Sequence, residues 1–159
     1  MIRKANINDY EKISGIYAKA REFMKSAGNP DQWGEGYPPR ERIEKDLAKG
    51  ALYLLTEGED MRAVFYFVIE RDASYKDIDT TLFGDKEYGV IHRVAVAIPG
   101  NGTVSEIFAY CEQMCPRLMI DTHKDNLPMQ RALGKAGFTA CATVYTELGG
   151  ERTAFYKGR

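Results

Sequence analysis

Residues 90–110 read VIHRVAVAIPGNGTVSEIFAY, a run that predicts a strand, a glycine turn and a helix in succession. Residues 90–96 are mainly apolar and β-branched, which predicts a strand buried on both faces. Residues 99–102 form a strong turn signal, and apolar residues recur at helical spacing from Val104 to Cys115. A glycine turn that leads into a helix directs free N–H groups toward one point, which predicts an anion site suited to phosphate. The alternative is that these glycines serve the backbone alone.

Composition places the chain among ordinary globular proteins with one domain, residues 1–159. Hydrophobic residues make up 44% of the chain and charged residues 28%, so a full core is available. The net charge is −1 without any block of like charge, which argues against a nucleic-acid-binding or polybasic membrane role. No apolar run has the length of a membrane span, and no secretory signal is recognisable at residues 1–8. We therefore expect a cytoplasmic protein.

The cysteines and histidines do not suggest a disulfide scaffold or a metal site. There are 3 cysteines, an odd number, and Cys111 and Cys115 share one face of a predicted helix among apolar neighbours. This pattern favours reduced, buried thiols over a redox or metal pair. His92 and His123 are the only histidines and neither lies in a Cys/His cluster, so no metal is predicted.

Periodicity and turn signals place the remaining elements. Asn8 with Glu11 resembles a capping box that begins a helix ending near Gly28, and Pro39 is expected as the first residue of a second helix. The predicted strands are residues 1–5, 51–56, 63–69, 90–96, 117–122, 138–145 and 152–156. Residues 71–87 are expected to be irregular, and Asp125 or Asn126 caps the last helix.

The predicted order β, α, α, β, β, β, α, β, α, β, β describes a mixed-sheet α/β (α+β) fold. The early strands form an antiparallel hairpin around residues 58–60. Strands 90–96 and 117–122 flank the helix at 103–115, so they are expected to run parallel.

Two motifs make the chain resemble the GNAT superfamily of N-acetyltransferases over nearly its whole length. Residues 94–96 followed by Gly100-Asn101-Gly102 are similar to the family's acetyl-CoA motif, a strand followed by Arg/Gln-x-x-Gly-x-Gly/Ala. Asn126-x-x-Met129 with Lys135 and Gly137-Phe138 is similar to the family's Asn-x-x-Ala/Met…Lys-x-Gly-Phe segment. The runs 120–123 and 150–152 also look like those of a small bacterial branch.

The resemblance implies acetyl-CoA as cosubstrate, bound where the parallel strands splay apart. Pantetheine would pair with the backbone of Val94, Ala95 and Val96 like an added strand. The pyrophosphate would be held by backbone N–H groups at the start of the helix, from Gly100, Asn101, Gly102 and Thr103. Asn126 would hydrogen-bond the pantetheine arm.

The chain departs from the family pattern at two positions. Ala97 stands where the motif has arginine or glutamine, and the loop is about two residues short, so phosphate binding would rest more on the backbone. Leu133 stands where the family often has a tyrosine that protonates the leaving thiolate. Leucine cannot donate a proton, so water or another side chain would take this role, or the thiolate would leave unassisted.

An amine must lose a proton before it attacks a thioester, and His92 and His123 are the candidate catalytic residues for this step. For each histidine the alternative is a structural role in hydrogen bonding to the backbone. Trp33 and Tyr37 lie in a loop that in this family often covers the acceptor pocket, although Trp33 could instead fill the core. Tyr145 is a further pocket candidate. Asp31 and Glu35, in the same loop as Trp33, could attract an ammonium group or could simply be solvated. Glu147, near Tyr145 at the end of a strand, is another pocket candidate.

These features predict transfer of an acetyl group from acetyl-CoA to a primary amine of a small-molecule or peptide acceptor. Attack would be direct, because none of the cysteines lies where a nucleophile is expected. The alternative is a catalytically weak or inactive GNAT-fold protein that binds CoA as a sensor, which Ala97 and Leu133 favour. A P-loop nucleotide binder is disfavoured because no Lys-Ser/Thr follows Gly102. Edge strands near the C-terminus suggest a homodimer.

Overall fold

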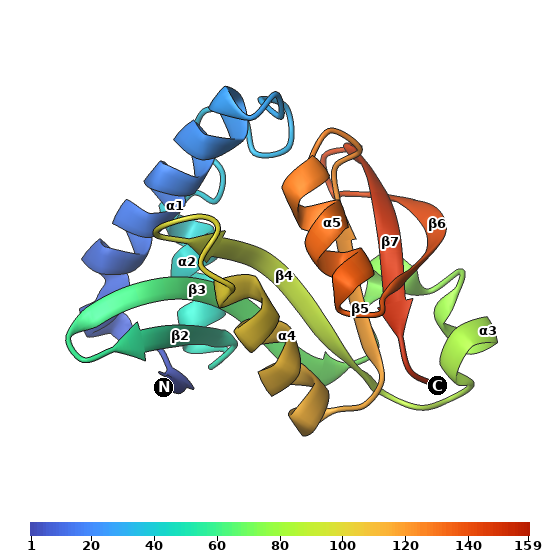
Figure 1. Cartoon of the computed structure of the whole chain (residues 1–159). Coiled ribbons are helices and arrows are strands. Elements are labelled where there is room, and N and C mark those ends of the chain that lie inside the picture. The colour runs from blue at the N-terminus through green and yellow to red at the C-terminus, as the bar shows by residue number, and fades with distance from the viewer.

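A seven-stranded sheet in the order β1-β2-β3-β4-β5-β7-β6 forms the centre of the computed structural model, which describes residues 1–159 (Figure 1). The strands are Ile2–Lys4 (β1), Leu52–Glu57 (β2), Asp60–Glu70 (β3), Tyr88–Val96 (β4), Leu118–Thr122 (β5), Thr139–Tyr145 (β6) and Glu151–Lys157 (β7). The helices are Tyr10–Ser26 (α1), Arg40–Ala48 (α2), Asp79–Phe83 (α3), Thr103–Met114 (α4) and Leu127–Lys135 (α5). None of them is both long and apolar enough to cross a membrane.

Only β4 and β5 run parallel, and every other neighbouring pair is antiparallel. The parallel pair is connected through α4, which confirms the predicted βαβ unit. The hairpin between β2 and β3 turns at residues 58–59, also as predicted. The mixed α/β fold class is therefore confirmed.

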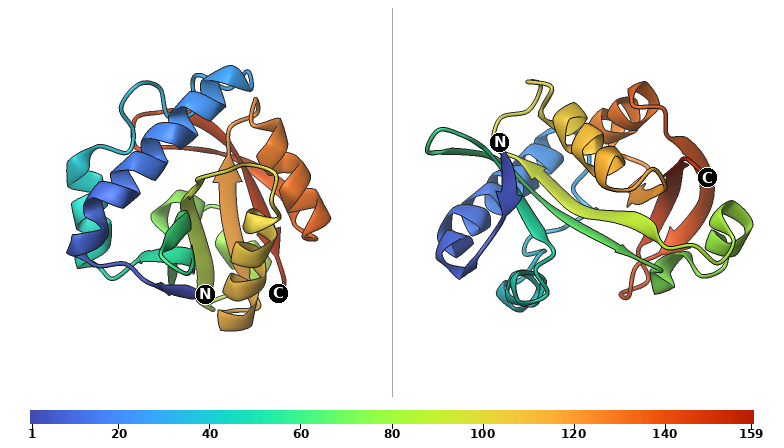
Figure 2. Two further views of the ribbon diagram at one scale, coloured as in Figure 1. Left: turned by 60° about the vertical axis from the view of Figure 1, so that its left-hand side comes forward. Right: turned by 90° about the horizontal axis from the view of Figure 1, so that it is seen from below.

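Helices cover both faces of the sheet, with α1 and α2 on one side and α4 and α5 on the other (Figure 2). Alternate residues along each strand therefore enter two separate cores. Val90 and Met119 join the core under α1 and α2, whereas Ile91 and Ile120 join the core under α4 and α5. This alternation decides which side chains of β4 and β5 can reach each side of the sheet.

The sequence signals for helix starts predicted some of them one or two residues away from their positions in the structure. The side chain of Asn6, not Asn8, begins the first helical segment, in a capping box with Asp9. The prediction from Asn8 and Glu11 was wrong because Asn6 offers the same Asx–x–x–acid spacing two residues earlier. Pro39 is the residue before α2 and not its first residue. Asn126 caps α5 through a hydrogen bond from the Met129 N–H, as predicted.

Residues 71–87 are less irregular than the sequence suggested. They contain a short 3-10 helix, Ala73–Tyr75, and the single turn of α3. Tyr75 and Phe83 are almost completely buried, which agrees with their predicted role as anchors. This segment therefore packs against the sheet as a strap next to the start of β4.

Candidate active site

The two parallel strands separate after three paired positions. Pairing of β4 with β5 ends at Ile91 and Ile120, while β4 continues along β3 as far as Val96. Beyond this point β5 pairs only with β7. Figure 1 shows the two strands diverging toward the end of β4. The backbone of Val94, Ala95 and Val96 therefore has no strand partner on the side that faces β5.

The separation corrects one detail of the sequence prediction. Residues 90–96 were expected to be buried on both faces, and Val90 and Ile91 are fully buried. Val94 and Val96 are only half-buried, because the sheet is open beside them. Their side chains pack at the edge of the core under α4.

A bulge in β4 occurs at the same place. Arg93 has φ 49° and is the only non-glycine residue with a positive φ. The β3–β4 register shifts here, so that His92 pairs with Tyr66 and Ala95 pairs with Val64. A bulge interrupts the alternation of side chains along a strand. His92 and Arg93 are consecutive, and both contact residues on the α1 and α2 side of the sheet.

Arg93 is held in this strained conformation by several contacts. Its Nε donates to Asp46 Oδ2 of α2 at 2.8 Å, and its carbonyl oxygen accepts from the Tyr17 hydroxyl of α1 at 3.3 Å. Its Nη1 donates to the Tyr37 hydroxyl at 3.3 Å, and the guanidinium lies 4.6 Å from the centre of the Tyr66 ring. Such surroundings can hold a backbone conformation that is unfavourable in isolation.

A cavity of about 670 Å³ opens on this face of the sheet beside the gap between β4 and β5. Its wall includes the three predicted pocket residues, Trp33, Tyr37 and Tyr145. Two predicted cofactor residues, Val94 and Asn126, also line it. The structure thus brings residues that are far apart in the sequence, from Trp33 to Tyr145, together around one cavity. Trp33 also packs edge-on against Tyr17, so it both covers the core and lines the cavity.

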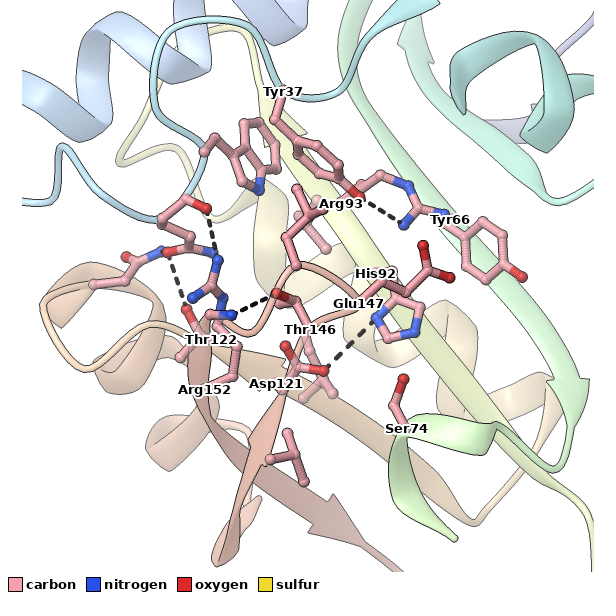
Figure 3. A pocket seen from close by; sticks show the side chains of 18 of the residues that line it. Tyr37, Tyr66, Ser74, His92, Arg93, Asp121, Thr122, Thr146, Glu147 and Arg152 are labelled. Atoms are coloured by element: carbon pink, nitrogen blue, oxygen red, sulfur yellow. Dashed lines mark hydrogen bonds and ion pairs between the residues drawn. The ribbon is translucent and has the colours of Figure 1, made fainter. Parts of the chain in front are cut away.

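His92 lies in the wall of this cavity, where it contacts two carboxylates. Figure 3 shows it next to one of them, Asp121. Its Nε2 is 3.1 Å from Asp72 Oδ2, and its Nδ1 is 3.9 Å from Asp121 Oδ2. The hydroxyl of the buried Tyr75 donates to the same Asp121 oxygen at 2.6 Å. Burial opposes ionisation of Asp72, but the hydrogen bond and charge of His92 outweigh it and lower the pKa of this carboxyl. The cluster can accept a proton on His92 and stabilise the resulting charge.

His123 lies elsewhere. It does not line the cavity, and its Nδ1 accepts a hydrogen bond from the Asp125 backbone N–H at 3.1 Å in the turn before α5. This placement favours the structural alternative for His123 and leaves His92 as the catalytic candidate.

The predicted phosphate loop has the backbone geometry of an anion site. Gly100 and Gly102 have φ 89° and 70°, and Gly102 is the left-handed residue directly before α4. No side chain caps this helix end, so the N–H groups of Thr103 and its neighbours have no partner within the helix. A ligand anion can bind these groups.

Arg62 of β3 lies next to this loop, although no sequence pattern singled it out. Its carbonyl oxygen accepts from the Ala97 N–H at 2.8 Å, so Arg62 lies across from the position where the family has a basic residue. Its Nη2 donates to Thr103 Oγ1 at 3.0 Å, and its Nη1 is 3.1 Å from Glu106 in the first turn of α4. The guanidinium offsets the negative charge of Glu106 at the helix end.

Gln32 is a second residue that the sequence did not indicate. Its Oε1 accepts from Asn29 Nδ2 at 2.8 Å and from Asn126 Nδ2 at 2.9 Å. Its carbonyl oxygen accepts from Arg152 Nη2 at 2.6 Å. These bonds connect the loop after α1 to α5 and β7 and so fix one wall of the cavity.

The other positions singled out in the sequence are divided between the cavity, the surface and the core. Asp31 and Glu147 line the cavity, whereas Glu35 is exposed and forms an ion pair with Lys25 at 2.6 Å. Leu133 lies on the inner face of α5 and is completely buried. The side chain at this position therefore belongs to the core and has no chemical role.

Comparison with solved structures identifies the fold. A GNAT-family acetyltransferase from Streptococcus agalactiae 2603 superposes with a TM-score of 0.88 at 25% identity, over 100% of this chain and 95% of that chain. The chain has the fold of the GNAT acetyltransferases. A structure from Staphylococcus aureus Mu50 described as an acetyltransferase matches at a TM-score of 0.74 and 26% identity, over 99% and 98% of the two chains.

A more distant GNAT-fold neighbour, from Salmonella typhimurium, is described as an acetyltransferase with its cofactor acetyl-CoA. It superposes with a TM-score of 0.62 at 17% identity, over 99% of this chain and 92% of that chain. No family model and no curated protein matches the sequence. The resemblance predicted from the two motifs is confirmed by these structures.

Proposed function

We propose that this protein transfers an acetyl group from acetyl-CoA to the primary amine of an acceptor. The observation that supports this most directly is the unpaired edge of β4, which opens onto the cavity that contains His92. The GNAT fold and the neighbour described with acetyl-CoA support the choice of cosubstrate.

In this proposal the chain's backbone binds most of the cofactor. The free edge of Val94–Val96 pairs with pantetheine, and the N–H groups from Gly100 to Thr103 hold the pyrophosphate. Arg62 supplies the positive charge that Ala97 cannot, from the neighbouring strand. Asn126 forms a hydrogen bond to the pantetheine arm. If its Nδ2 is the donor, the present hydrogen bond from Nδ2 to Gln32 Oε1 must be shared or broken.

The reaction begins with transfer of a proton from the acceptor ammonium to His92, directly or through water. Asp72 and Asp121 stabilise the imidazolium. The amine nitrogen then attacks the thioester carbon and the C–S bond breaks. The second proton lost from this nitrogen passes through water to the departing CoA thiolate, and His92 releases the first proton to solvent. The CoA thiol has a pKa not far above the ~8.5 of a free cysteine, so its thiolate can leave without an acid, which is consistent with Leu133 in place of tyrosine.

The cysteines support direct attack. Cys111 and Cys115 are buried in the core under α4, and burial raises the pKa of Cys111 far above its usual value. Cys141 is partly buried with its Sγ against the Ala154 carbonyl, and none of the three lines the cavity. No covalent acetyl-enzyme intermediate is therefore proposed. The homodimer and the cytoplasmic location predicted from the sequence stay predictions.

Two measurements test the proposal. Acetyl-CoA should raise the melting temperature, and a panel of primary amines should release free CoA in the presence of enzyme. Stabilisation by acetyl-CoA without release of CoA by any amine would favour the CoA-sensor alternative. Stabilisation by ATP in place of acetyl-CoA would contradict the assignment of the glycine loop to CoA.

A further inference from the structure

We infer that the acceptor has a carboxylate next to its amine, as a free amino acid does, and that Arg152 binds this carboxylate. The inference rests on the proposed acetyl transfer, because it names the acceptor of that reaction. It starts from the charges in the cavity wall.

Arg152 of β7 lines the cavity and is half-buried there. Its Nη1 donates to the Glu151 carbonyl at 2.8 Å and its Nη2 to the Gln32 carbonyl at 2.6 Å. A guanidinium has five N–H donors, so three remain for a ligand. No carboxylate lies within ion-pair distance of Arg152, and burial lowers the pKa of this guanidinium, with only Asp121 among the carboxylates opposing the effect.

The other cavity arginines already have partners. Arg93 forms a buried ion pair with Asp46 at 2.8 Å, and Arg42 lies 3.6 Å from Glu147. Arg152 is thus the one guanidinium in the wall whose charge lacks a carboxylate contact. The fork of an arginine matches a carboxylate in size and geometry, which makes this the ligand that Arg152 is best suited to bind.

The acidic part of the wall lies beside it on the same face of the sheet. Asp121 pairs with Ala154, and Arg152 is two residues from Ala154 along β7, so both side chains project to the same side. Diagonal neighbours of this kind are roughly 7–8 Å apart, with their Cβ atoms somewhat closer. Figure 3 shows Asp121 between His92 and Arg152. An ammonium bound at Asp121 and a carboxylate bound at Arg152 can therefore belong to one small molecule.

This arrangement also orients the acceptor. Asp121 and His92 border the gap between β5 and β4, where the thioester is proposed to lie, so the amine end points toward it. A polyamine would instead place a second ammonium near Arg152, and a protein N-terminus has a peptide carbonyl in place of the carboxylate. The exposed Glu147, which could attract such cations, is at the rim and pairs with Arg42.

The test compares amino acids with their C-terminal amides, which share the amine and differ in the carboxylate. We expect the wild-type protein to prefer the acids in kcat/KM by about 10- to 100-fold, the range for a hydrogen-bonded charge pair. Arg152→Gln should remove this preference by slowing the acids alone, and Arg152→Lys should keep part of it. Arg117→Gln is the matched control, because the one hydrogen bond of the Arg117 side chain is to the Glu87 carbonyl and Arg117 does not line the cavity.

Arg152 also tethers the Gln32 loop, so the ratio of acid to amide is the decisive quantity. An equal loss for acids and amides in Arg152→Gln would show a structural role only and overturn the inference, as would a wild-type protein that does not distinguish them. Calorimetric binding of both ligands in the presence of CoA decides the same question without turnover. If no amine is acetylated, the proposed function fails, whereas a binding preference for the acid that depends on Arg152 would still support the carboxylate site.

Discussion

At the scale of single residues, the chemistry of the site depends on the conformation of Arg93. Its positive φ creates the bulge in β4, next to the point where β4 and β5 separate. Because of the bulge, the consecutive side chains of His92 and Arg93 both lie on the α1 and α2 side of the sheet and contact different residues there. Arg93 connects β4 to α1 and α2, and His92 remains free to contact Asp72 and the cavity.

Replacement of His92 should separate catalysis from cofactor binding. We expect His92→Gln to lower kcat by about 100-fold or more, the usual contribution of a general base, with the KM for acetyl-CoA nearly unchanged. His123→Ala is the control, because His123 lies outside the cavity. Normal turnover in His92→Gln, or a larger loss in His123→Ala, would contradict the assignment.

Replacement of Arg62 tests whether a neighbouring strand supplies the missing basic residue. We expect Arg62→Gln to raise the Kd for CoA by about 5- to 10-fold, because one charge-assisted contact to phosphate is lost and Glu106 is left unbalanced. Arg62→Lys should retain most of the affinity. The effect should be smaller for dephosphorylated pantetheine fragments, measured by calorimetry. Equal Kd values for wild type and Arg62→Gln would leave Arg62 with a purely structural role.

Among the helices and strands, the sequence predicted best those that depend on interactions between neighbouring residues. The β4–α4–β5 unit follows from a β-branched run, a glycine turn and helical spacing, and all three act within about ten residues. The separation from β5 was predicted only through the resemblance to the GNAT family, and the bulge at Arg93 could not be predicted, because no residue type in VIHRVAV signals either feature. They result from how β4 is held between β3, α1 and α2.

In the candidate site too, some residues could be recognised from the sequence and others only from the fold. The glycine loop and the aromatic residues Trp33 and Tyr37 were accessible from the sequence because their chemistry is distinctive. Asp72, Gln32 and Arg152 are common residue types that gain significance only through contacts across 20, 94 and 120 positions of the chain. Single polar residues in loops and at strand ends give no periodic signal, so only the fold brings them together.

The loop before α4 permits a test of the anion site at the level of the element. Gly102→Glu should abolish measurable CoA binding, because a carboxylate would lie where the phosphate belongs. Gly102→Ala is the matched control, since it introduces the same strain at φ 70° without charge and meets no atom within 4 Å. We expect a lower melting temperature in both variants and a much larger loss of affinity in Gly102→Glu. Equal CoA affinity in the two variants would place the phosphate elsewhere.

At the scale of the whole molecule, the strap at residues 71–87 is part of both the core and the site. Arg71 donates to Asp79 at 2.6 Å, and the Tyr88 hydroxyl donates to the second oxygen of the same carboxyl at 2.9 Å. The Asp72 N–H then donates to the Tyr88 hydroxyl at 3.0 Å, which places the Asp72 carboxylate against His92. The fold and the proposed general base His92 thus share one hydrogen-bonded network.

This sharing predicts how stability depends on pH. The pKa of Asp72 is lower in the folded protein than in the unfolded chain, where it is about 3.9. The ionised Asp72 carboxylate therefore contributes its full share to the free energy of unfolding above this pH. The contribution is lost as the pH falls below it, because Asp72 takes up a proton in the unfolded chain before it does so in the folded protein. When the pH is lowered from 6 to 3, the free energy of unfolding should fall by about 1 kcal/mol less in Asp72→Asn than in the wild type. Urea unfolding measures this, with the exposed Asp85→Asn as control. Parallel pH curves for wild type and Asp72→Asn would show that the carboxylate does not stabilise the fold through His92.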